Sequence, residues 1–340
     1  MPIASILSRY EPVMRWSVSE GESGWNNTTR IAEDACGVKR VLRIYETHRD
    51  ADKIAFEHEV LLKLGTCGLP FAVPRPVAMP SGATFATLTD GTGRYAALFT
   101  YTEGVRPDGT DPIVASAIGD AVGRLSLALR DLRPEASPAY WPCYELERTH
   151  PSCPGSVIAS FCETPPAQFA GKREELGRIG EALRAFEAAL PAIRALPHQL
   201  VHGDVNDSNL LADPQDLTRI AAILDFEFCT MELRAMEPAV VLAGWMGEED
   251  HFLAAEAFLR SYANIVSLSA EEIEALPLLM KLRRLDVFVH FLGRYLSGVD
   301  DAAVLLQQTR ETDAGLTALS RQASRIRNLL RDTLMGRGRA

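Results

Sequence analysis

The stretch "LVHGDVNDSNLL", residues 200 to 211, places a histidine, two aspartates and two asparagines between two apolar runs. Within it, Asp204 is followed five residues later by Asn209. A second apolar run, "AAILDFE" at residues 221 to 227, ends in Asp225 and Phe226. Two interpretations are open. The stretch is either a polar turn followed by an aspartate at a strand end, or a site that holds a metal ion and takes a proton from a hydroxyl.

The spacing favours the second interpretation. Phosphoryl transfer from a nucleotide to a hydroxyl needs a metal ion to neutralise phosphate charge and a carboxylate that orients the hydroxyl and accepts its proton. Protein kinases provide these groups with an Asp, an Asn five residues later, and a second Asp that opens a short Asp-Phe motif. Asp204, Asn209 and Asp225 have this order and spacing. Their side-chain oxygens are hard ligands of the kind that suits Mg²⁺.

The first hundred residues predict strands with one helix. Two strands flank a turn at Asp34 to Lys39, and a helix runs from about Asp50 to Leu64, with Gly65 as its C-cap. The segment "RYAALFTYTEG" predicts a further strand that ends in a turn at Gly104.

Beyond residue 103 the apolar positions recur every three or four residues, which indicates helices. Residues 134 to 166 show no clear period and predict an irregular insertion. A later helix is expected to begin at Ser269, where "SAEE" has the form of a capping box. The predicted fold class is α+β, with a β-rich N-lobe at residues 1–103, a larger α-helical C-lobe at residues 104–340, and a cleft at their junction.

Composition narrows the function classes. The chain has 340 residues and a net charge of −10, which argues against non-specific nucleic-acid binding. No uninterrupted apolar run reaches the length of a membrane span, so no membrane partner is expected. The six cysteines form no CxxC pair, and the N-terminal residues show no secretory pattern. We therefore expect a cytoplasmic protein, and the sequence does not predict its oligomeric state.

These motifs resemble those of the aminoglycoside phosphotransferase and choline kinase superfamily, which carries "HGD....N" and "DF". The resemblance is nearest to the homoserine kinase-like branch. It covers most of the chain and is strongest over residues 200–211, 223–245 and 268–296. It implies a protein-kinase-like bilobal fold with ATP, or GTP, in the cleft. It also implies that Asp204 is the catalytic base and that Asn209 and Asp225 bind Mg²⁺.

A kinase also needs a cation on the strand before the helix, to hold the α and β phosphates. Arg43 lies there, where the superfamily has Lys or, in some branches, Arg. In the following helix Glu57 shares an apolar stripe with Ile54, Leu61 and Leu64. Because an unpaired buried carboxylate is costly, Glu57 is the predicted partner of Arg43. The alternative is a partly exposed Glu57 in a loosely packed helix.

The phosphate-covering turn is assigned to "EGESGWNNTT", residues 20 to 29, with Asn26 and Asn27. It resembles the Asn-Thr turn of homoserine kinases but lacks Gly-x-Gly-x-x-Gly, so an ordinary hairpin loop is the alternative. The resemblance also places the backbone carbonyl of Thr100 and the N–H of Thr102 against the adenine edge.

The acceptor pocket is expected to draw on carboxylates of the C-lobe. The candidates are Glu227, Glu232, Glu237 and the acidic residues 248–250, with a mainly structural role for Glu237. Asp207 is interpreted as a solvated turn residue that could touch the substrate.

A polar stripe crosses the helix that follows Ser269. It could bind an acidic group such as an amino-acid carboxylate, or form internal ion pairs, and both interpretations stay open. Its members are Arg283, Asp286, His290 and Arg294.

The sequence therefore predicts an ATP-dependent O-phosphotransferase that acts on a hydroxyl of a small molecule. The acceptor would be an amino alcohol, a hydroxy amino acid such as homoserine, or an aminosugar. The alternatives are an antibiotic-inactivating aminoglycoside-type phosphotransferase and a catalytically dead kinase-like binding protein.

Overall fold

The structure is a computed structural model of the full chain and describes residues 2–47, 50–246 and 251–335. By their contacts, the residues divide into two compact units. The first unit comprises Met1–Arg106, Asp131–Ala139 and Asn209–Glu227, and the second comprises Pro107–Arg130, Tyr140–Ser208 and Phe228–Ala340. The division therefore differs from one cut near residue 103, since a late segment of the chain belongs to the first unit.

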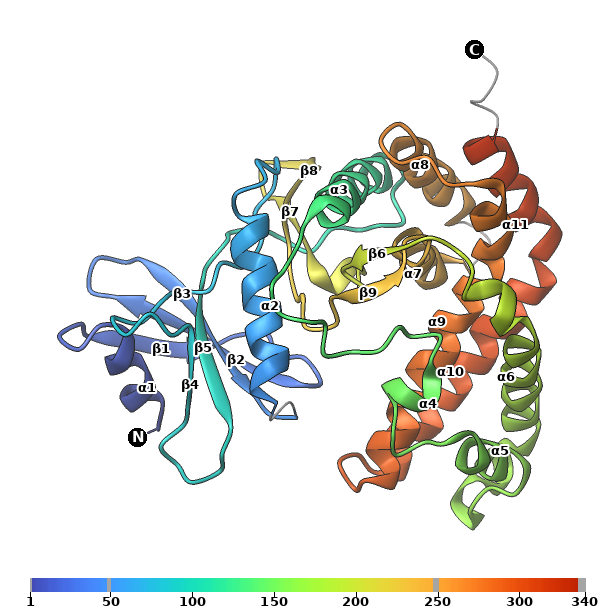
Figure 1. The fold of residues 1–340 in the computed structure, drawn as a ribbon, viewed down its shortest axis with the longest axis horizontal. Coiled ribbons are helices and arrows are strands. Elements are labelled where there is room, and N and C mark those ends of the chain that lie inside the picture. The colour runs from blue at the N-terminus through green and yellow to red at the C-terminus, as the bar shows by residue number, and fades with distance from the viewer. Residues whose placement is uncertain (1, 48–49, 247–250, 336–340) are drawn as a thin grey trace. The chain divides into compact units, whose positions relative to one another are not determined.

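The first unit is built on a five-stranded antiparallel sheet with the order β1-β2-β3-β5-β4 (Figure 1). The predicted turn joins β2 to β3, and Asp34 Oδ1 accepts hydrogen bonds there from the N–H groups of Cys36 and Val38. The strands are β1 (Trp16–Glu20), β2 (Asn27–Asp34), β3 (Lys39–Tyr45), β4 (Phe85–Thr87) and β5 (Tyr95–Thr100).

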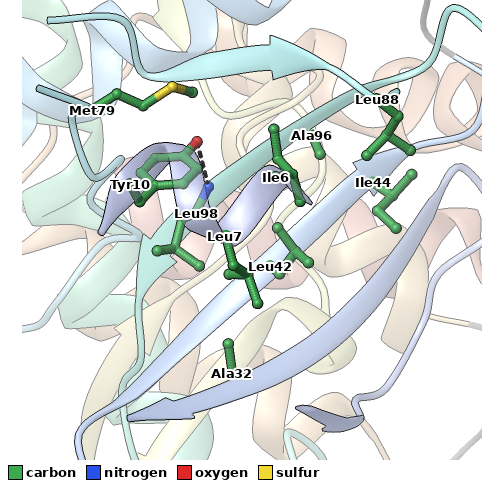
Figure 2. Packing of buried hydrophobic residues seen from close by; sticks show 10 residues of the cluster. All are labelled: Ile6, Leu7, Tyr10, Ala32, Leu42, Ile44, Met79, Leu88, Ala96 and Leu98. Atoms are coloured by element: carbon green, nitrogen blue, oxygen red, sulfur yellow. Dashed lines mark hydrogen bonds between the residues drawn. The ribbon is translucent and has the colours of Figure 1, made fainter. Parts of the chain in front are cut away.

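One face of this sheet packs against helix α1 (Pro2–Tyr10), as Figure 2 shows. Leu42 and Ile44 of β3 point to that face, and Tyr10 Oη accepts a hydrogen bond of 3.1 Å from the Leu98 N–H. The prediction of a single helix in the first hundred residues was wrong. Ile6, Leu7 and Tyr10 are spaced like one helical stripe and are buried against the sheet.

Helix α2 (Ala51–Leu64) packs against the other face of the sheet. Side chains alternate along β3, so Arg43 and Tyr45 point to this face and contact Glu57 of α2. The Asp50 side chain caps the helix by accepting from the Asp52 N–H, and the Gly65 N–H donates to Leu61 at the other end. Both predicted ends of this helix are confirmed.

The hairpin of β7 (Leu210–Asp213) and β8 (Asp216–Ile223) explains why a late segment joins the first unit. Backbone hydrogen bonds connect Val105 with Ala212 in both directions, and Ala72 pairs with Ala222. These bonds lie far apart in sequence, so local patterns do not reveal them.

The second unit is mostly helical. Helix α9 has 27 residues, and α6, α7, α10 and α11 all pack on it. Ser269 is its N-cap, and the capping box with Glu272 is present as predicted. Strands β6 (His198–Val201) and β9 (Thr230–Leu233) pair antiparallel. The main helices are α3 (Pro112–Asp131), α6 (Arg173–Ile193), α7 (Met236–Trp245), α8 (Phe252–Ala263), α9 (Ala270–Leu296), α10 (Ala302–Arg321) and α11 (Ala323–Leu330).

The segment at 134–166 was predicted to be irregular, and this was partly wrong. It contains α4 (Leu146–Thr149) and α5 (Gly155–Glu163), followed by the 3₁₀ helix η1 (Ala167–Lys172). Helix α5 buries Ile158, Phe161 and Cys162 and packs on α6. The helix is only nine residues long, and the frequent prolines around it obscured its helical periodicity.

Among the described residues, helix α3 alone is long and apolar enough to span a membrane by length and composition. Its apolar run is interrupted by Asp120 and Arg124, which form an exposed ion pair of 2.7 Å. The opposite side of α3 is buried, with Ile118, Val122 and Leu125 out of contact with solvent. This is the pattern of an amphipathic helix that packs on the core of its own unit.

Candidate active site

A buried ion pair connects strand β3 with helix α2. Arg43 Nη1 lies 2.8 Å from Glu57 Oε1, and only 12% and 3% of the two side chains are exposed. The Tyr45 hydroxyl lies 3.3 Å from Glu57 Oε2 and 3.2 Å from His58 Nε2. The predicted ion pair is thus present, and the alternative of a partly exposed Glu57 is excluded. Its role in nucleotide binding stays a prediction.

Glu59, two residues along α2, has a separate environment. Its carboxylate accepts hydrogen bonds from the N–H groups of Glu135 and Ala136 and pairs with Lys63 at 3.1 Å. Glu57 and Glu59 therefore differ in burial and in partner, although both belong to one helix.

Asp225 is the second carboxylate next to Arg43. Its Oδ1 lies 3.4 Å from Arg43 Nη2, is buried, and has no hydrogen-bond partner among the described residues. Burial opposes the charge of Arg43, but Glu57 and Asp225 outweigh it and raise the pKa of the guanidinium. Asp225 has φ of 64°, a left-handed conformation that only Asn, Asp and Gly adopt with any frequency.

The hairpin brings the two predicted metal ligands together. Strand β7 begins directly after Asn209 and β8 ends two residues before Asp225. Leu224 N–H donates to the Asn209 carbonyl at 2.8 Å, so Asn209 and Asp225 lie at the same open end of the β7–β8 hairpin.

These residues fit a Mg²⁺ ion that is shared with phosphate. No group of three or more His, Cys, Asp or Glu side chains able to hold a metal occurs in the described part of the chain. Mg²⁺ commonly binds through one or two protein oxygens and completes its shell with water and substrate phosphates. The buried Oδ1 of Asp225, which accepts no hydrogen bond within the described part of the chain, is an oxygen available for that purpose.

Asn26 and Asn27 hold Glu227, the residue two positions after Asp225. Asn26 Nδ2 donates to Glu227 Oε1 at 2.8 Å, and Asn27 Nδ2 donates to Oε2 at 2.7 Å. All three side chains are buried. Burial first, and Asp225 second, raise the pKa of Glu227 to about 8. Both carboxylate oxygens of Glu227 thus accept hydrogen bonds at the start of β2, and its contact with a substrate stays a prediction.

The predicted adenine-binding segment lies at the end of the sheet. Thr100 is the last residue of β5, opposite Arg40 of β3, and its N–H donates to the Arg75 carbonyl at 2.9 Å. Thr102 follows in a stretch without regular secondary structure. Their contacts with the adenine edge stay predictions.

In the second unit, hydrogen bonds to His202 hold the loop that carries Asp204 in place. The buried His202 donates its backbone N–H to Glu237 Oε2 at 2.8 Å, and its Nδ1 accepts from the Asp204 N–H at 3.2 Å. Glu237 is fully buried in α7. The structural role predicted for Glu237 matches this position. Gly203 has φ of 82°, so the turn before Asp204 requires a residue that tolerates the left-handed region.

Asp204 forms an ion pair with Arg283 of α9, whose Nη2 donates to Asp204 Oδ1. Arg283 Nη1 lies 3.6 Å from Asp286 Oδ2, and Asp286 Oδ1 lies 2.8 Å from His150 Nε2. Burial opposes the charge of Arg283, but Asp204 and Asp286 outweigh it and raise its pKa. Arg283 and Asp286 of the polar stripe thus form internal ion pairs, and binding of an acidic group by the stripe stays a prediction.

Two further substrate candidates have other partners. Asp207 is half-buried, accepts a hydrogen bond of 3.3 Å from Trp245 Nε1, and leaves no room for a side chain at Gly109. It anchors the loop, and its prediction as a solvated turn residue was wrong. His290 packs against the rings of His150 and Phe291, and burial lowers its pKa to about 4, which keeps the imidazole neutral.

Glu232 on β9 also serves as an anchor. It is buried and accepts hydrogen bonds from the N–H groups of Cys143 and Leu233. Burial raises the pKa of Glu232 to about 7. The acidic residues 248–250 lie outside the described residues.

Sequence reasoning missed two members of these networks. Tyr45 could have been found, because it lies two positions after Arg43 and therefore points to the same face of β3. His150 gave no such signal, since it lies in the stretch predicted as irregular and meets Asp286 only through the tertiary fold.

Comparisons with known proteins agree with this geometry. The model of the phosphotransferase enzyme family, APH, matches residues 17–271. A homoserine kinase of Rhodopseudomonas palustris is 28% identical over 289 residues, covering 82% of this chain and 80% of that protein. A homoserine kinase of Afipia carboxidovorans is 31% identical over 248 residues, covering 71% and 68%.

Solved structures share the fold. A microcompartment-associated aminopropanol kinase superimposes with a TM-score of 0.68 at 18% identity, covering 94% of this chain and 96% of that one. An amicoumacin kinase in complex with AMP-PNP superimposes with a TM-score of 0.63 at 17% identity, covering 92% and 91%.

The kinase-like fold and the superfamily resemblance are thereby confirmed. Since the family model spans most of the sequence, including both the β2–β3 hairpin and the Asp204 loop, the chain belongs to the phosphotransferase enzyme family and is a small-molecule kinase.

Proposed function

We propose that this protein is an ATP-dependent O-phosphotransferase that, with Mg²⁺, phosphorylates the hydroxyl of a small hydroxy amino acid or amino alcohol. One observation carries the proposal. Arg43 contacts Glu57 and Asp225 together, while the Leu224 to Asn209 hydrogen bond sets Asn209 at the same hairpin end as Asp225. A cation and two oxygen ligands next to each other suit a metal–polyphosphate group.

In this proposal Arg43 binds nonreacting phosphate oxygens, and Glu57 holds the guanidinium in place. Asn209 and Asp225 hold the Mg²⁺, which neutralises phosphate charge when it is bound. Asn26 and Asn27 fix the turn between β1 and β2 through Glu227. Thr100 and Thr102 receive the adenine through their backbone.

At the acceptor end, Asp204 orients the hydroxyl and accepts its proton during transfer. The anchoring of its loop by His202 and Glu237 supports this role, because a base must be held within hydrogen-bond reach of one hydroxyl. The homoserine kinases among the relatives support a hydroxy amino acid as acceptor.

The rival function of a catalytically dead binding protein is disfavoured by the complete set of Asp204, Asn209 and Asp225. An antibiotic-inactivating enzyme would use the same set, so the acceptor has to be measured. ADP release is followed with homoserine, threonine, choline, ethanolamine and aminoglycosides, each with and without Mg²⁺. We expect Mg²⁺-dependent ADP release with a hydroxy amino acid or amino alcohol. Absence of ADP release with every acceptor contradicts the proposal.

A further inference from the structure

The ion pair between Arg283 and Asp204 places a positive charge next to the proposed catalytic base. A guanidinium beside a carboxylate stabilises the ionised form and makes it a weaker base. Asp204, the proposed base, would work better without that neighbour. Since only 23% of the Arg283 side chain is exposed, the charge is also costly to maintain. Its position therefore needs a reason other than proton transfer.

Arg283 has unused hydrogen-bonding capacity. A guanidinium carries five N–H donors. Among the described residues, Arg283 makes one hydrogen bond, to Asp204. The Asp286 contact of 3.6 Å is an ion pair without a hydrogen bond, and Asp286 is already bonded to His150 at 2.8 Å. The planar donor fork of Arg283 is thus available to a further anionic group.

The other arginine of the stripe shows a different arrangement. Arg294 lies on the same helix, and both Nε and Nη2 donate to the two oxygens of Asp300, at 2.5 Å and 2.9 Å. This bidentate pair supplies Arg294 with hydrogen-bond acceptors from within the protein. In the part of the chain that the structure describes, Arg283 has no such bidentate partner, although it forms an ion pair with the proposed base.

We propose that Arg283 binds the carboxylate of the acceptor, so that the enzyme selects hydroxy amino acids over amino alcohols and aminosugars. The inference rests on the proposed function. A carboxylate on Arg283 brings the hydroxyl of the same small molecule to the neighbouring Asp204. A polycationic aminosugar would instead meet the positive charge of Arg283 at this point.

The test uses three pairs of acceptors that differ by the carboxylate alone: serine with ethanolamine, threonine with 1-aminopropan-2-ol, and homoserine with 3-aminopropan-1-ol. In the wild type we expect kcat/KM for the favoured acid to exceed that of its amino alcohol at least about 100-fold. Arg283→Met should bring this ratio close to one, mainly through the acid. Arg283→Lys should keep part of the preference, because a point charge still attracts a carboxylate.

Arg294→Met is the matched control, since it removes the same charge from the same helix and should leave the ratio unchanged. Calorimetric titration of the favoured acid measures carboxylate binding without chemistry, so the comparison holds even where Arg283→Met is inactive. We expect at least about tenfold weaker binding in Arg283→Met.

Four outcomes contradict the inference. Equal activity on both members of each pair, or an equal loss for both in Arg283→Met, means that Arg283 only positions Asp204. Activity on choline or aminoglycosides alone also refutes it, while the phosphotransferase function stands. If no hydroxyl compound is phosphorylated, the proposed function itself is wrong and the inference falls with it.

Discussion

Arg43 and Glu57 form an ion pair of 2.8 Å that is almost completely withdrawn from water, and the same guanidinium reaches Asp225 at 3.4 Å. Helix α2 is therefore connected through one side chain to the strand end that carries a proposed metal ligand. A displacement of α2 would move Arg43 relative to Asp225. Glu57 is buried, but a change at Glu57 should therefore still affect nucleotide binding.

Glu57→Gln should raise the KM for ATP and lower kcat, because Arg43 loses the charge that holds it. The free energy of unfolding should fall by about 1–3 kcal/mol, since the buried guanidinium of Arg43 loses its nearest negative charge. Glu59→Gln on the same helix is the control and should leave both kinetic constants unchanged. A kinetic loss in Glu59→Gln with none in Glu57→Gln would refute this role.

Asp225→Asn should weaken Mg·ATP binding by at least about 100-fold, more than the loss of an outer-shell partner costs. Asn tolerates the left-handed backbone found at this position, so the fold should be retained. Calorimetry with and without Mg²⁺ measures the effect. Unchanged metal-dependent affinity would make Asp225 a structural residue of the strand end.

Asp204→Asn should lower kcat by about 10²–10⁴-fold while ATP affinity stays within a few-fold of wild type. The amide keeps a hydrogen-bond acceptor for Arg283 but cannot take the proton. Asp213→Asn, at the last residue of β7, is the control and should remain active. Turnover close to wild type in Asp204→Asn is the result that removes Asp204 from the chemistry.

His58 should make the protein sensitive to acid. Burial, with a smaller effect of Arg43, lowers the pKa of His58 from 6.5 to about 3. Between these values the unfolded chain binds the proton and the folded chain does not, so stability is lost as the pH falls. The stability difference between wild type and His58→Gln should shrink by about 1.4 kcal/mol per pH unit below about 6. Urea unfolding at several pH values measures it, and a constant difference contradicts the assignment.

The N-terminus of α9 should depend on its capping box. Ser269→Ala should lower the free energy of unfolding by about 1 kcal/mol. Glu272→Gln should cost more, because the fully buried Glu272 also binds Arg234 through two hydrogen bonds of 2.6 Å. Chemical denaturation measures both changes. The reverse order would show that the contact with Arg234 contributes little.

The local chemistry of the sequence was sufficient for several elements. The Asp50 cap and Gly65 bound α2, the turn at Asp34 joins β2 to β3, and Ser269 starts α9, because caps and turns depend on neighbouring residues. The Arg43–Glu57 pair was also predictable, since a carboxylate on a buried stripe requires a cation. Helix α1 was missed although its stripe is visible, and α5 was missed because prolines surround it.

Only the tertiary structure decided the rest. The sequence indicated which residues are proposed to carry the chemistry, because the types and spacing of Asp204, Asn209 and Asp225 suit one reaction. It could not assign the β7–β8 hairpin to the first unit, turn Glu227 towards Asn26 and Asn27, or choose Asp204 as the partner of Arg283. These contacts join residues from 79 to 201 positions apart. Such pairings depend on how whole helices and strands pack, and periodicity within one segment contains no information about that.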